Sequence, residues 1–367
     1  MSLHILFAGY APVHFVCFLP LYRRLAALPG VEVYVSGGLR SGEPGNYRYD
    51  TQAMYAPFGL PPQRVLAVDA LRELEFDVLF AAHTKLILPQ RAGRTIQIFH
   101  GISYRNRAVR PENMSCDHYF IVGPYMRRRF AAAGLLPAGD GRAVPIGFMK
   151  TDPLLEGSLD RHRVLARYGF TGARPLVLYA PTGAQHNSLE TMGEQVIEQL
   201  VRADRYDLLI KLHDHPKNTT IDWRARLARF EGAHCRVADE PDVIPLLHAA
   251  DLLVSDASSV ANEYTLLDRP IVYLDVPELI AEARARENSM LDLDTWGRRA
   301  GLVVARPEDA EGAIAFSLAH PYTNSDVRRA MARDFFYNPG RATDAAIDWL
   351  QRHVLPAAAR AARAVAR

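Results

Sequence analysis

Cysteine is scarce in this chain, and the few cysteines present lie far apart. The 367 residues include only Cys17, Cys116 and Cys235, an odd number without a closely spaced pair. This pattern argues against a zinc ribbon and against a disulfide framework. No stretch approaches the roughly 18 to 20 apolar residues that cross a bilayer, and no basic segment precedes the first apolar strand. We therefore expect neither a membrane span nor a signal peptide.

A strong excess of charge of one sign is also lacking. Lys and Arg together number 43 and Asp and Glu 41, which leaves a formal net charge of +2. The surface as a whole is therefore not built to hold nucleic acid, and any anion-binding site must be local. Only Lys85, Lys150, Lys211 and Lys217 are lysines, so a lysine inside a motif is more informative than usual.

Several common motifs are absent. The sequence contains no GxGxxG, no GxxxxGK[ST] and no GxSxG. The interpretations as a dinucleotide oxidoreductase, a P-loop kinase and an α/β-hydrolase thereby lose their main support.

Short apolar runs alternate with helical patterns along the whole chain. This alternation is typical of βαβ units, in which helices cover parallel sheets. The first half has candidate strands at 5–8, 31–35, 78–80, 95–99, 118–122 and 144–146. A second series follows at 176–179, 208–210, 235–237, 252–254, 271–274 and 302–304. Helical patterns fit residues 13–28, 189–202, 243–249, 260–267, 309–319 and segments between 325 and 355.

Chain length and these two series of strands predict an α/β protein with two domains of similar size. We expect two doubly wound, Rossmann-like domains that face a central cleft. The first domain covers residues 1–150 and the second residues 151–355, with an Ala/Arg tail at 356–367. Ligands of open parallel sheets bind beyond the carboxyl ends of the strands, so motifs that directly follow strands carry the most weight.

His100 directly follows an apolar strand and precedes Gly101, which allows a sharp turn. A histidine at that place has a near-neutral pKa that suits a general base. A histidine that merely hydrogen-bonds the next loop fits the residues equally well.

Two motifs follow strands of the second domain. Thr182 closes the turn after strand 176–179 and either caps the next segment or contacts an anion. In Lys211-Leu212-His213-Asp214-His215-Pro216, alternation places Lys211, His213 and His215 on one side and Asp214 on the other. Such a cluster suits phosphate oxygens better than a metal, because the sequence nominates no third ligand.

A third motif, Ser255-Asp256-Ala257-Ser258-Ser259, lies between strand 252–254 and a helix that contains Glu263. Ser258 or Ser259 is a natural helix N-cap. Hydroxyl groups and backbone N–H groups at such a place also make a phosphate cradle. The two roles do not exclude each other.

In their order, these motifs resemble the CDP-glycerol glycerophosphotransferase family, the teichoic-acid polymerases and primases with a two-domain GT-B fold. The matching stretches are Phe99-His100-Gly101, residues 147–154, Leu178 to Thr182, Ile210 to His213, Ser255 to Ser259 with Glu263, and Asn338 to Thr343.

The resemblance implies that His100 removes the proton from an acceptor hydroxyl, and that His213, Ser258 and Ser259 hold the pyrophosphate with Thr182 nearby. His215 competes with His213 for this role because a proline follows it. We include Lys211, Asp256 and Glu263 in the donor site. We assign Ser103 and Arg105 to the acceptor.

The implied reaction is a metal-independent phosphotransfer without a cofactor, in which a hydroxyl attacks the β-phosphorus of a CDP-linked polyol phosphate, most simply glycerol phosphate, and CMP leaves. The expected partners are this donor and a cell-surface glycan or lipid-linked acceptor. We expect a cytoplasmic protein, with peripheral contact to the inner membrane surface as one option and no nucleic acid partner. The alternatives are a sugar transferase of the same fold, an enzyme like the UDP-sugar 2-epimerases, and a binding module without catalysis. His100 and the intact Ser258-Ser259 pair argue against the binding module.

Overall fold

The computed structural model describes residues 2–42, 46–82, 87–214 and 218–355. The chain divides into two compact units, and each unit is made of segments that are separate in the sequence. The first unit consists of Met1–His100, Ala108–Asp152 and Phe336–Arg367, and the second of Gly101–Arg107 and Pro153–Phe335.

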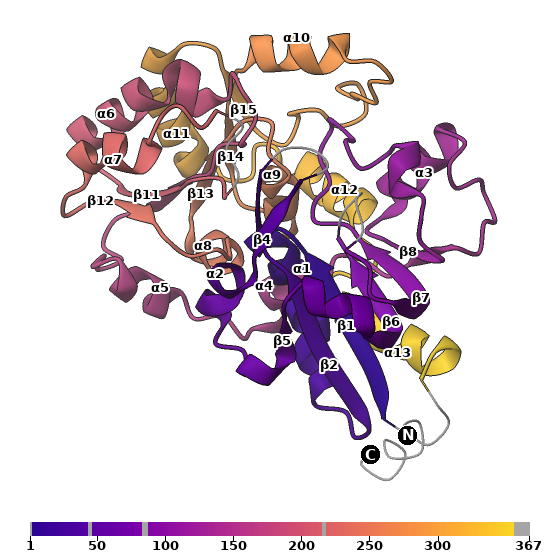
Figure 1. The fold of residues 1–367 in the computed structure, drawn as a ribbon. Coiled ribbons are helices and arrows are strands. Elements are labelled where there is room, and N and C mark those ends of the chain that lie inside the picture. The colour runs from indigo at the N-terminus through magenta and orange to yellow at the C-terminus, as the bar shows by residue number, and fades with distance from the viewer. Residues whose placement is uncertain (1, 43–45, 83–86, 215–217, 356–367) are drawn as a thin grey trace. The chain divides into compact units, whose positions relative to one another are not determined.

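The first unit is built on a seven-stranded sheet with the order β5-β2-β1-β6-β7-β8-β9, in which all neighbours are parallel (Figure 1). Its strands are β1 (Leu3–Gly9), β2 (Val31–Gly37), β5 (Val65–Leu66), β6 (Glu75–Ala81), β7 (Arg91–Ile98), β8 (His118–Ile121) and β9 (Ala143–Pro145). The antiparallel pair β3 (Leu39–Ser41) and β4 (Arg48–Asp50) lies outside this sheet. The strands expected from the first half of the sequence are thus confirmed.

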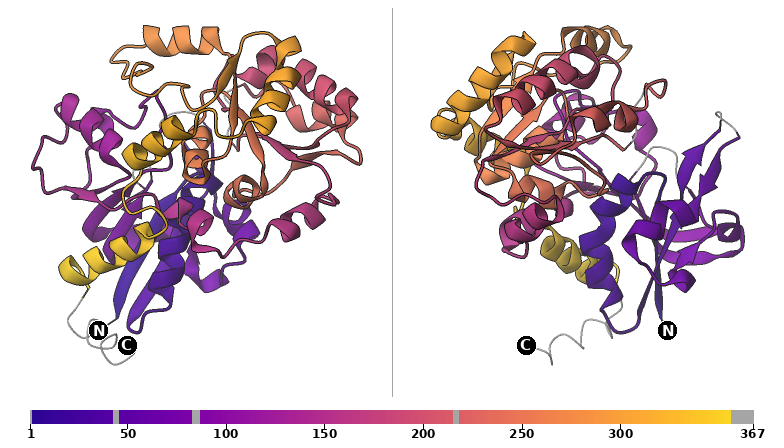
Figure 2. Two further views of the ribbon diagram at one scale, coloured as in Figure 1. Left: turned by 180° about the vertical axis from the view of Figure 1, so that it is seen from behind. Right: turned by 90° about the vertical axis from the view of Figure 1, so that its left-hand side faces the viewer.

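Alternating side chains of β1 pack on both faces of this sheet. Phe7 stacks on Phe80 with ring centroids 4.7 Å apart, and it also contacts Phe18 of helix α1 (Pro12–Ala26) at 5.1 Å. Its neighbour Leu6 joins a second cluster with Leu79 on the opposite face. Burial on both faces explains why the central strands are apolar almost throughout. Figure 2 shows α1 lying along β1 and β2.

The remaining helices of the first unit are α2 (Thr51–Tyr55), α3 (Pro124–Ala132) and α13 (Ala342–His353). Helix α13 contacts α1, where Arg24 and Asp344 form an ion pair of 2.9 Å. Its first turn is held by the carboxylate of Asp152, which accepts hydrogen bonds from the N–H groups of Ala342 at 3.0 Å and Thr343 at 2.7 Å.

A close backbone approach brings the chain before α13 to the end of β9. Gly147 has a φ of +108°, and a Cβ atom there would lie 2.1 Å from the carbonyl oxygen of Tyr337. The amide of Asn338 donates to the carbonyl of Ile146 at 3.0 Å. Two motifs that were matched to the family, around Gly147 and Asn338, therefore meet in space to join α13 to the first unit.

The boundaries expected from the sequence differ from those of the structure in two segments. Helix α13 was assigned to the second domain by its position in the chain, but it belongs to the first unit. Asp152 accepts hydrogen bonds from its first turn, and Gly147 packs closely against the segment that precedes it. Residues 101–107 were assigned to the first domain, but they belong to the second unit.

The second unit is built on a six-stranded parallel sheet with the order β12-β11-β10-β13-β14-β15 (Figure 1). Its strands are β10 (Leu176–Tyr179), β11 (Asp207–Lys211), β12 (Cys235–Ala238), β13 (Leu252–Ser255), β14 (Ile271–Leu274) and β15 (Leu302–Val304). Its helices are α4 (Pro153–Glu156), α5 (Arg161–Arg167), α6 (Glu194–Ala203), α7 (Trp223–Leu227), α8 (Ile244–Ala249), α9 (Val260–Tyr264), α10 (Pro277–Ala285), α11 (Ala310–Ala319) and α12 (Ser325–Phe335). Every strand of the second predicted series is present.

A cluster of buried side chains in this unit lies between the sheet and helices α6 and α11. Val177, Ile210 and Val254 from the sheet share it with Ile197 of α6 and Ile314 of α11. The helix expected over 189–202 is split, because a π-helical turn at Leu189–Gly193 precedes α6. Within the described ranges, no helix combines the length and the apolar character needed to cross a membrane.

Candidate functional site

The three motifs of the second unit meet at one edge of its sheet. Strand β10 lies between β11 and β13, and each of the three loops that follow these strands begins at a carboxyl end. The chain leaves β10 toward β11 on one side, while β13 lies on the other side. This is a topological switch point, the usual ligand site of an open parallel sheet. The sequence-based prediction that these motifs share one sheet edge is confirmed.

Asp256 organises the loops at this edge. Its carboxylate is completely buried and accepts hydrogen bonds from the N–H groups of Thr182 at 2.8 Å, Ser188 at 3.0 Å and Ala257 at 2.6 Å, and from the Ser188 hydroxyl at 2.8 Å. Because both oxygens are engaged and an ionised carboxylate repels phosphate, its visible role is to position the loops. A direct contact with the donor stays a prediction.

The serine pair begins helix α9. Ser259 occupies the N-cap position, but its side chain makes no capping hydrogen bond. Ser258 accepts a hydrogen bond from the N–H of Val260 at 3.4 Å, which is long for such a bond. The Ser259 hydroxyl is therefore not committed to the cap. Glu263 is completely buried in α9, and its contact with a donor also stays a prediction.

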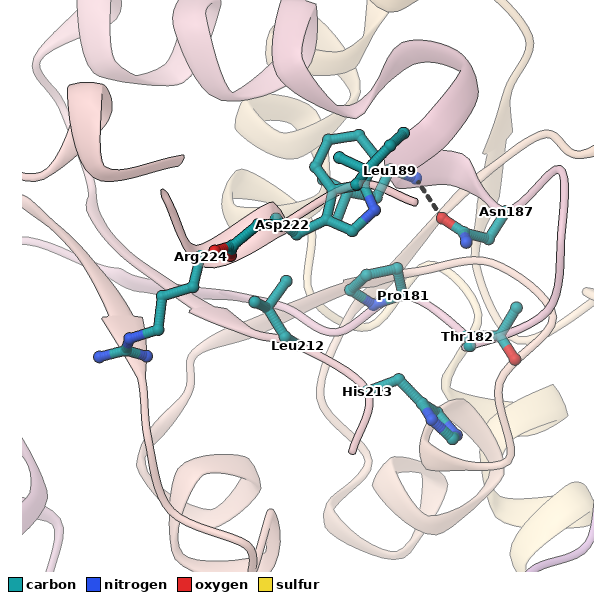
Figure 3. A pocket seen from close by; sticks show the side chains of 11 residues that line it. Pro181, Thr182, Asn187, Leu189, Leu212, His213, Asp222 and Arg224 are labelled. Carbon is teal, nitrogen blue, oxygen red and sulfur yellow. Dashed lines mark hydrogen bonds between the residues drawn. The ribbon is translucent and has the colours of Figure 1, made fainter. Parts of the chain in front are cut away.

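A pocket of about 220 Å³ opens beside the loops that follow β10 and β11 (Figure 3). Its apolar lining consists of Pro181, Leu189, Leu212, Ile221 and Trp223, and its polar lining includes Thr182, Asn187 and His213. In Figure 3, Thr182 and His213 lie at one end and Arg224 at the other. The volume is below the about 300 to 1,000 Å³ typical of pockets for whole ligands, so it suits one part of a larger ligand, such as a nucleobase.

The motif after β11 differs from its expected geometry. Lys211 is buried and forms an ion pair of 2.7 Å with Asp214, which was expected to point to the opposite side. Strict alternation fails because the strand ends at Lys211 and the chain then turns. His213 is exposed and lines the pocket. His215 lies outside the described residues.

Segment 101–107 is fixed to the second unit by hydrogen bonds along its length. The Asn262 amide donates to the carbonyl of Ile102 at 2.9 Å, and the N–H of Asp292 donates to the carbonyl of Tyr104 at 2.8 Å. Ser103 is half-buried in a turn in which its carbonyl accepts the N–H of Asn106.

The guanidinium of Arg105 donates to the Thr182 hydroxyl at 2.9 Å, which places Arg105 beside the loop after β10. Arg105 was expected at the acceptor site, but it contacts Thr182, which was expected at the donor site.

In the first unit, His100 follows β7 and is exposed. Its Nδ1 lies 3.1 Å from the carbonyl oxygen of Ala82, just beyond the end of β6. A carbonyl only accepts hydrogen bonds, so Nδ1 is the donor, and in the neutral ring Nε2 carries the lone pair. This is the tautomer that a general base needs.

A second histidine that the sequence analysis missed lies next to His100. The ring of His14, buried in the first turn of α1, has its centroid 4.9 Å from that of His100. Its Nδ1 accepts the N–H of Tyr10 at 3.2 Å, so the ring is the Nε2–H tautomer when it is neutral. Gly9 makes room for it, since a Cβ there would lie 2.7 Å from the Cβ of His14.

Other features of the site also had no sequence signal. Asp222 and Trp223 lie at the start of the short helix α7, which follows the Lys211-to-Pro216 motif but matches no motif itself, and only the fold shows that they line the pocket. Asn187 and Ser188 are equally inconspicuous. Across the described ranges, no group of three or more His, Cys, Asp or Glu side chains is arranged to hold a metal ion.

Comparison with known families gives one match that covers more than half of the chain. Residues 89–338 match the family described as CDP-Glycerol:Poly(glycerophosphate) glycerophosphotransferase. The teichoic acid glycerol-phosphate primase of Bacillus subtilis (strain 168) is 29% identical over 138 residues, which are 36% of this chain and 33% of that protein. The primase of Bacillus spizizenii is 32% identical over 130 residues, 35% of this chain and 32% of that protein. The matched part thus spans about a third of the length of these relatives.

Solved structures share the fold at low sequence identity. The wall teichoic acid polymerase TagF superposes with a TM-score of 0.62 and 14% identity, over 95% of this chain and 88% of that chain. A UDP-GlcNAc 2-epimerase from Neisseria meningitidis, solved with UDP-GlcNAc, gives 0.57 and 12% identity, over 96% and 100%. The predicted α/β, GT-B-like fold class is confirmed.

Proposed function

This chain belongs to the CDP-glycerol glycerophosphotransferase family, and we propose that it transfers glycerol phosphate from CDP-glycerol to a hydroxyl group of an acceptor. The observation that carries the proposal is the extent of the family match, which includes both His100 and the three loops of the second unit. The division of the chain supports it as well, because the candidate base lies in one unit and the loops suited to a nucleotide in the other.

In the proposed reaction, Nε2 of His100 accepts the proton of the attacking hydroxyl. The hydroxyl oxygen forms a bond to the β-phosphorus, and the bond from that phosphorus to the bridging oxygen breaks. The electron pair of the broken bond leaves with CMP. Holding donor and acceptor in line lowers the barrier, and positive groups beside the phosphoryl oxygens stabilise the transition state.

The second unit holds the donor in this proposal. The apolar pocket with Trp223 and Leu212 takes the cytosine, while His213, Thr182 and the serine pair at α9 face the diphosphate. Lys211 and Asp214 stabilise the loop that carries His213, since their ion pair joins its two ends. We further propose that cationic side chains of the chain itself neutralise the diphosphate, so that the reaction needs no divalent metal or other cofactor.

The proposed acceptor is a glycan or lipid-linked hydroxyl of the cell envelope. The names of the primase and polymerase relatives support this class of acceptor. A lipid-linked acceptor would place the protein at the cytoplasmic face of the membrane, in peripheral contact with it.

The test is a donor panel. Purified protein is offered CDP-glycerol, CDP-ribitol, UDP-glucose and UDP-GlcNAc, each with and without a lipid-linked acceptor, and nucleotide release is measured. We expect acceptor-dependent CMP release from CDP-glycerol, and we expect it to persist in EDTA.

The matched control is the His100→Gln variant, which should bind the donor but release CMP far more slowly than wild type. UDP release from a UDP-sugar, or its epimerisation, would replace this proposal by one of the alternative enzymes. Loss of CMP release in EDTA with recovery on adding Mg²⁺ would overturn metal independence alone.

A further inference from the structure

Arg105 carries a positive charge that lacks a counter-ion. Its Nη2 donates to the Thr182 hydroxyl, while its Nε is shielded from solvent and has no hydrogen-bond partner. No acidic side chain of the described residues forms an ion pair with it. Buried charges in proteins are normally paired, because an uncompensated charge loses its hydration without return.

The charged groups around Arg105 do not neutralise its positive charge. Asp256 is the main source of attraction, but its oxygens are occupied by backbone N–H groups and the Ser188 hydroxyl. The guanidinium of Arg286 acts in the opposite sense. Burial outweighs these effects and lowers the pKa of Arg105. The guanidinium is thus held in an environment that favours the approach of an anion.

The position of Arg105 indicates which anion. Nε and Nη2 form one edge of the guanidinium, the edge that binds phosphate oxygens in bidentate fashion. This edge meets Thr182, which lies at the switch point and lines the pocket together with His213. The segment is rigidly held, since Asn262 and the N–H of Asp292 bind the carbonyls on either side of Ser103.

We propose that Arg105 binds a phosphate group of the nucleotide donor together with Thr182, instead of the acceptor assigned from the sequence. This inference rests on the proposed function for the identity of the nucleotide. A diphosphate would supply the negative counter-ion that Arg105 lacks, and one of its oxygens would accept the hydrogen bond of Nε.

Calorimetry with CDP and with cytidine tests the proposal in the full-length protein. Arg105→Gln should weaken CDP binding about 10- to 100-fold, the range expected for a lost charge-assisted hydrogen bond, and leave cytidine binding unchanged. Arg105→Lys keeps the charge without the fork and should lie between wild type and Arg105→Gln. The matched control is Arg107→Gln, an exposed arginine of the same segment, which should change neither affinity.

The ligand-free melting temperature separates binding from structure. Because Arg105→Gln removes a half-buried charge that has no ion-pair partner, this variant should melt at the wild-type temperature or above it. Equal losses of CDP and cytidine affinity with a lower melting temperature would show that Arg105 only supports the loop. Unchanged CDP affinity would overturn the proposal, and so would a higher KM for the acceptor with unchanged CDP affinity.

Failure of the proposed function would be recognised separately. Wild-type protein would then not bind CDP, and titration with UDP and with inorganic pyrophosphate would still decide whether Arg105 holds a diphosphate. Pyrophosphate affinity that is equal in wild type and Arg105→Gln would overturn the inference in that case too.

Discussion

A backbone carbonyl fixes the tautomer of the candidate base. The oxygen of Ala82 keeps the proton of His100 on Nδ1, which leaves Nε2 to accept a proton. The sequence pointed to His100 because it follows a strand and precedes a glycine. It did not reveal the tautomer, since Ala82 lies on a different strand connection and carries no signal in its own side chain.

The first prediction concerns this histidine. His100→Ala should lower kcat by about 10²- to 10⁴-fold, the usual effect of removing a positioned base, because it removes the group that we propose takes the acceptor proton. CDP affinity should stay near wild type, since His100 belongs to the first unit. Single-turnover kinetics and calorimetry measure the two effects. Near-wild-type turnover would mean that the base lies elsewhere.

A second prediction concerns Gly101. A Cβ atom at this position would lie 2.8 Å from the Ser259 hydroxyl oxygen and 3.2 Å from the Ser259 Cβ, so the hydroxyl must move and the serine must shift slightly if alanine is introduced. We expect Gly101→Ala to weaken CDP binding several-fold with little change in melting temperature, because a serine side chain rotates at small cost.

The control for this variant is Gly141→Ala, where a Cβ would meet nothing within 4 Å. Calorimetry on both variants provides the measurement. Equal CDP affinity in Gly101→Ala and wild type would show that the Ser259 hydroxyl does not contribute to donor binding.

Among the secondary-structure elements, the buried strands were the easiest to predict and the short edge elements the hardest. Strands such as β10 and β13 are buried at every residue and almost entirely apolar, because helices cover both faces of their sheet. In contrast, β3 and β4 are three-residue strands of largely polar composition, so they show no pattern. Helix α7, which brings Trp223 to the pocket, has only five residues, too few for a helical period.

The third prediction concerns the start of α9. Ser258→Ala combined with Ser259→Ala should reduce or abolish the rise in melting temperature that CDP causes. The ligand-free melting temperature should change little, because Ser259 makes no capping bond and Ser258 only a long one. Thermal melts with and without CDP measure both effects. An unchanged CDP-induced rise would show that the two hydroxyls do not contact the donor.

The fourth prediction concerns the start of α13. Asp152→Ala removes the acceptor for two N–H groups and should lower the free energy of unfolding by about 0.5 to 2 kcal/mol, the range measured when the N–H groups of a first helical turn lose a capping side chain. Asp152→Asn keeps an acceptor oxygen and should lose less. Urea unfolding measures both variants. Equal stability of Asp152→Ala and wild type would contradict the capping role.

The same variants give a pH dependence. Burial raises the pKa of Asp152 above its usual value of 3.8, so the folded protein binds this proton more tightly than the unfolded chain does. The resulting contribution to stability is complete below pH 3.8 and declines as the pH rises through the higher pKa of the folded state. Relative to Asp152→Asn, wild type should therefore lose stability over this range and then level off. The opposite slope would show that the hydrogen bonds to the carboxylate outweigh its burial.

For the whole molecule, the sequence indicated two α/β units but misplaced the ends of each. Linear reasoning assigns neighbouring residues to the same domain, whereas residues 101–107 and α13 follow their hydrogen bonds into the other unit. The sequence around residues 101 and 336, where the chain passes from one unit to the other, has no local pattern that predicts this change.

The fifth prediction uses this division. CDP should slow amide hydrogen exchange in the loops after β10, β11 and β13 and also in residues 101–107, because all belong to the second unit. Saturation at about 100 times Kd should stabilise that unit by about 2.7 kcal/mol. Exchange followed by mass spectrometry gives the map. Protection concentrated at the ends of β1 and β6 would place the nucleotide in the first unit instead.

The late position of α13 has a consequence for synthesis on the ribosome. The first unit begins with β1 but is completed only when α13 has been made, whereas residues 153–335 of the second unit form one uninterrupted stretch. Domains generally fold as their residues emerge, at about 5 to 20 residues per second. The second unit therefore becomes able to fold while the first still lacks its last helix, and the half of the protein that is translated first is finished last.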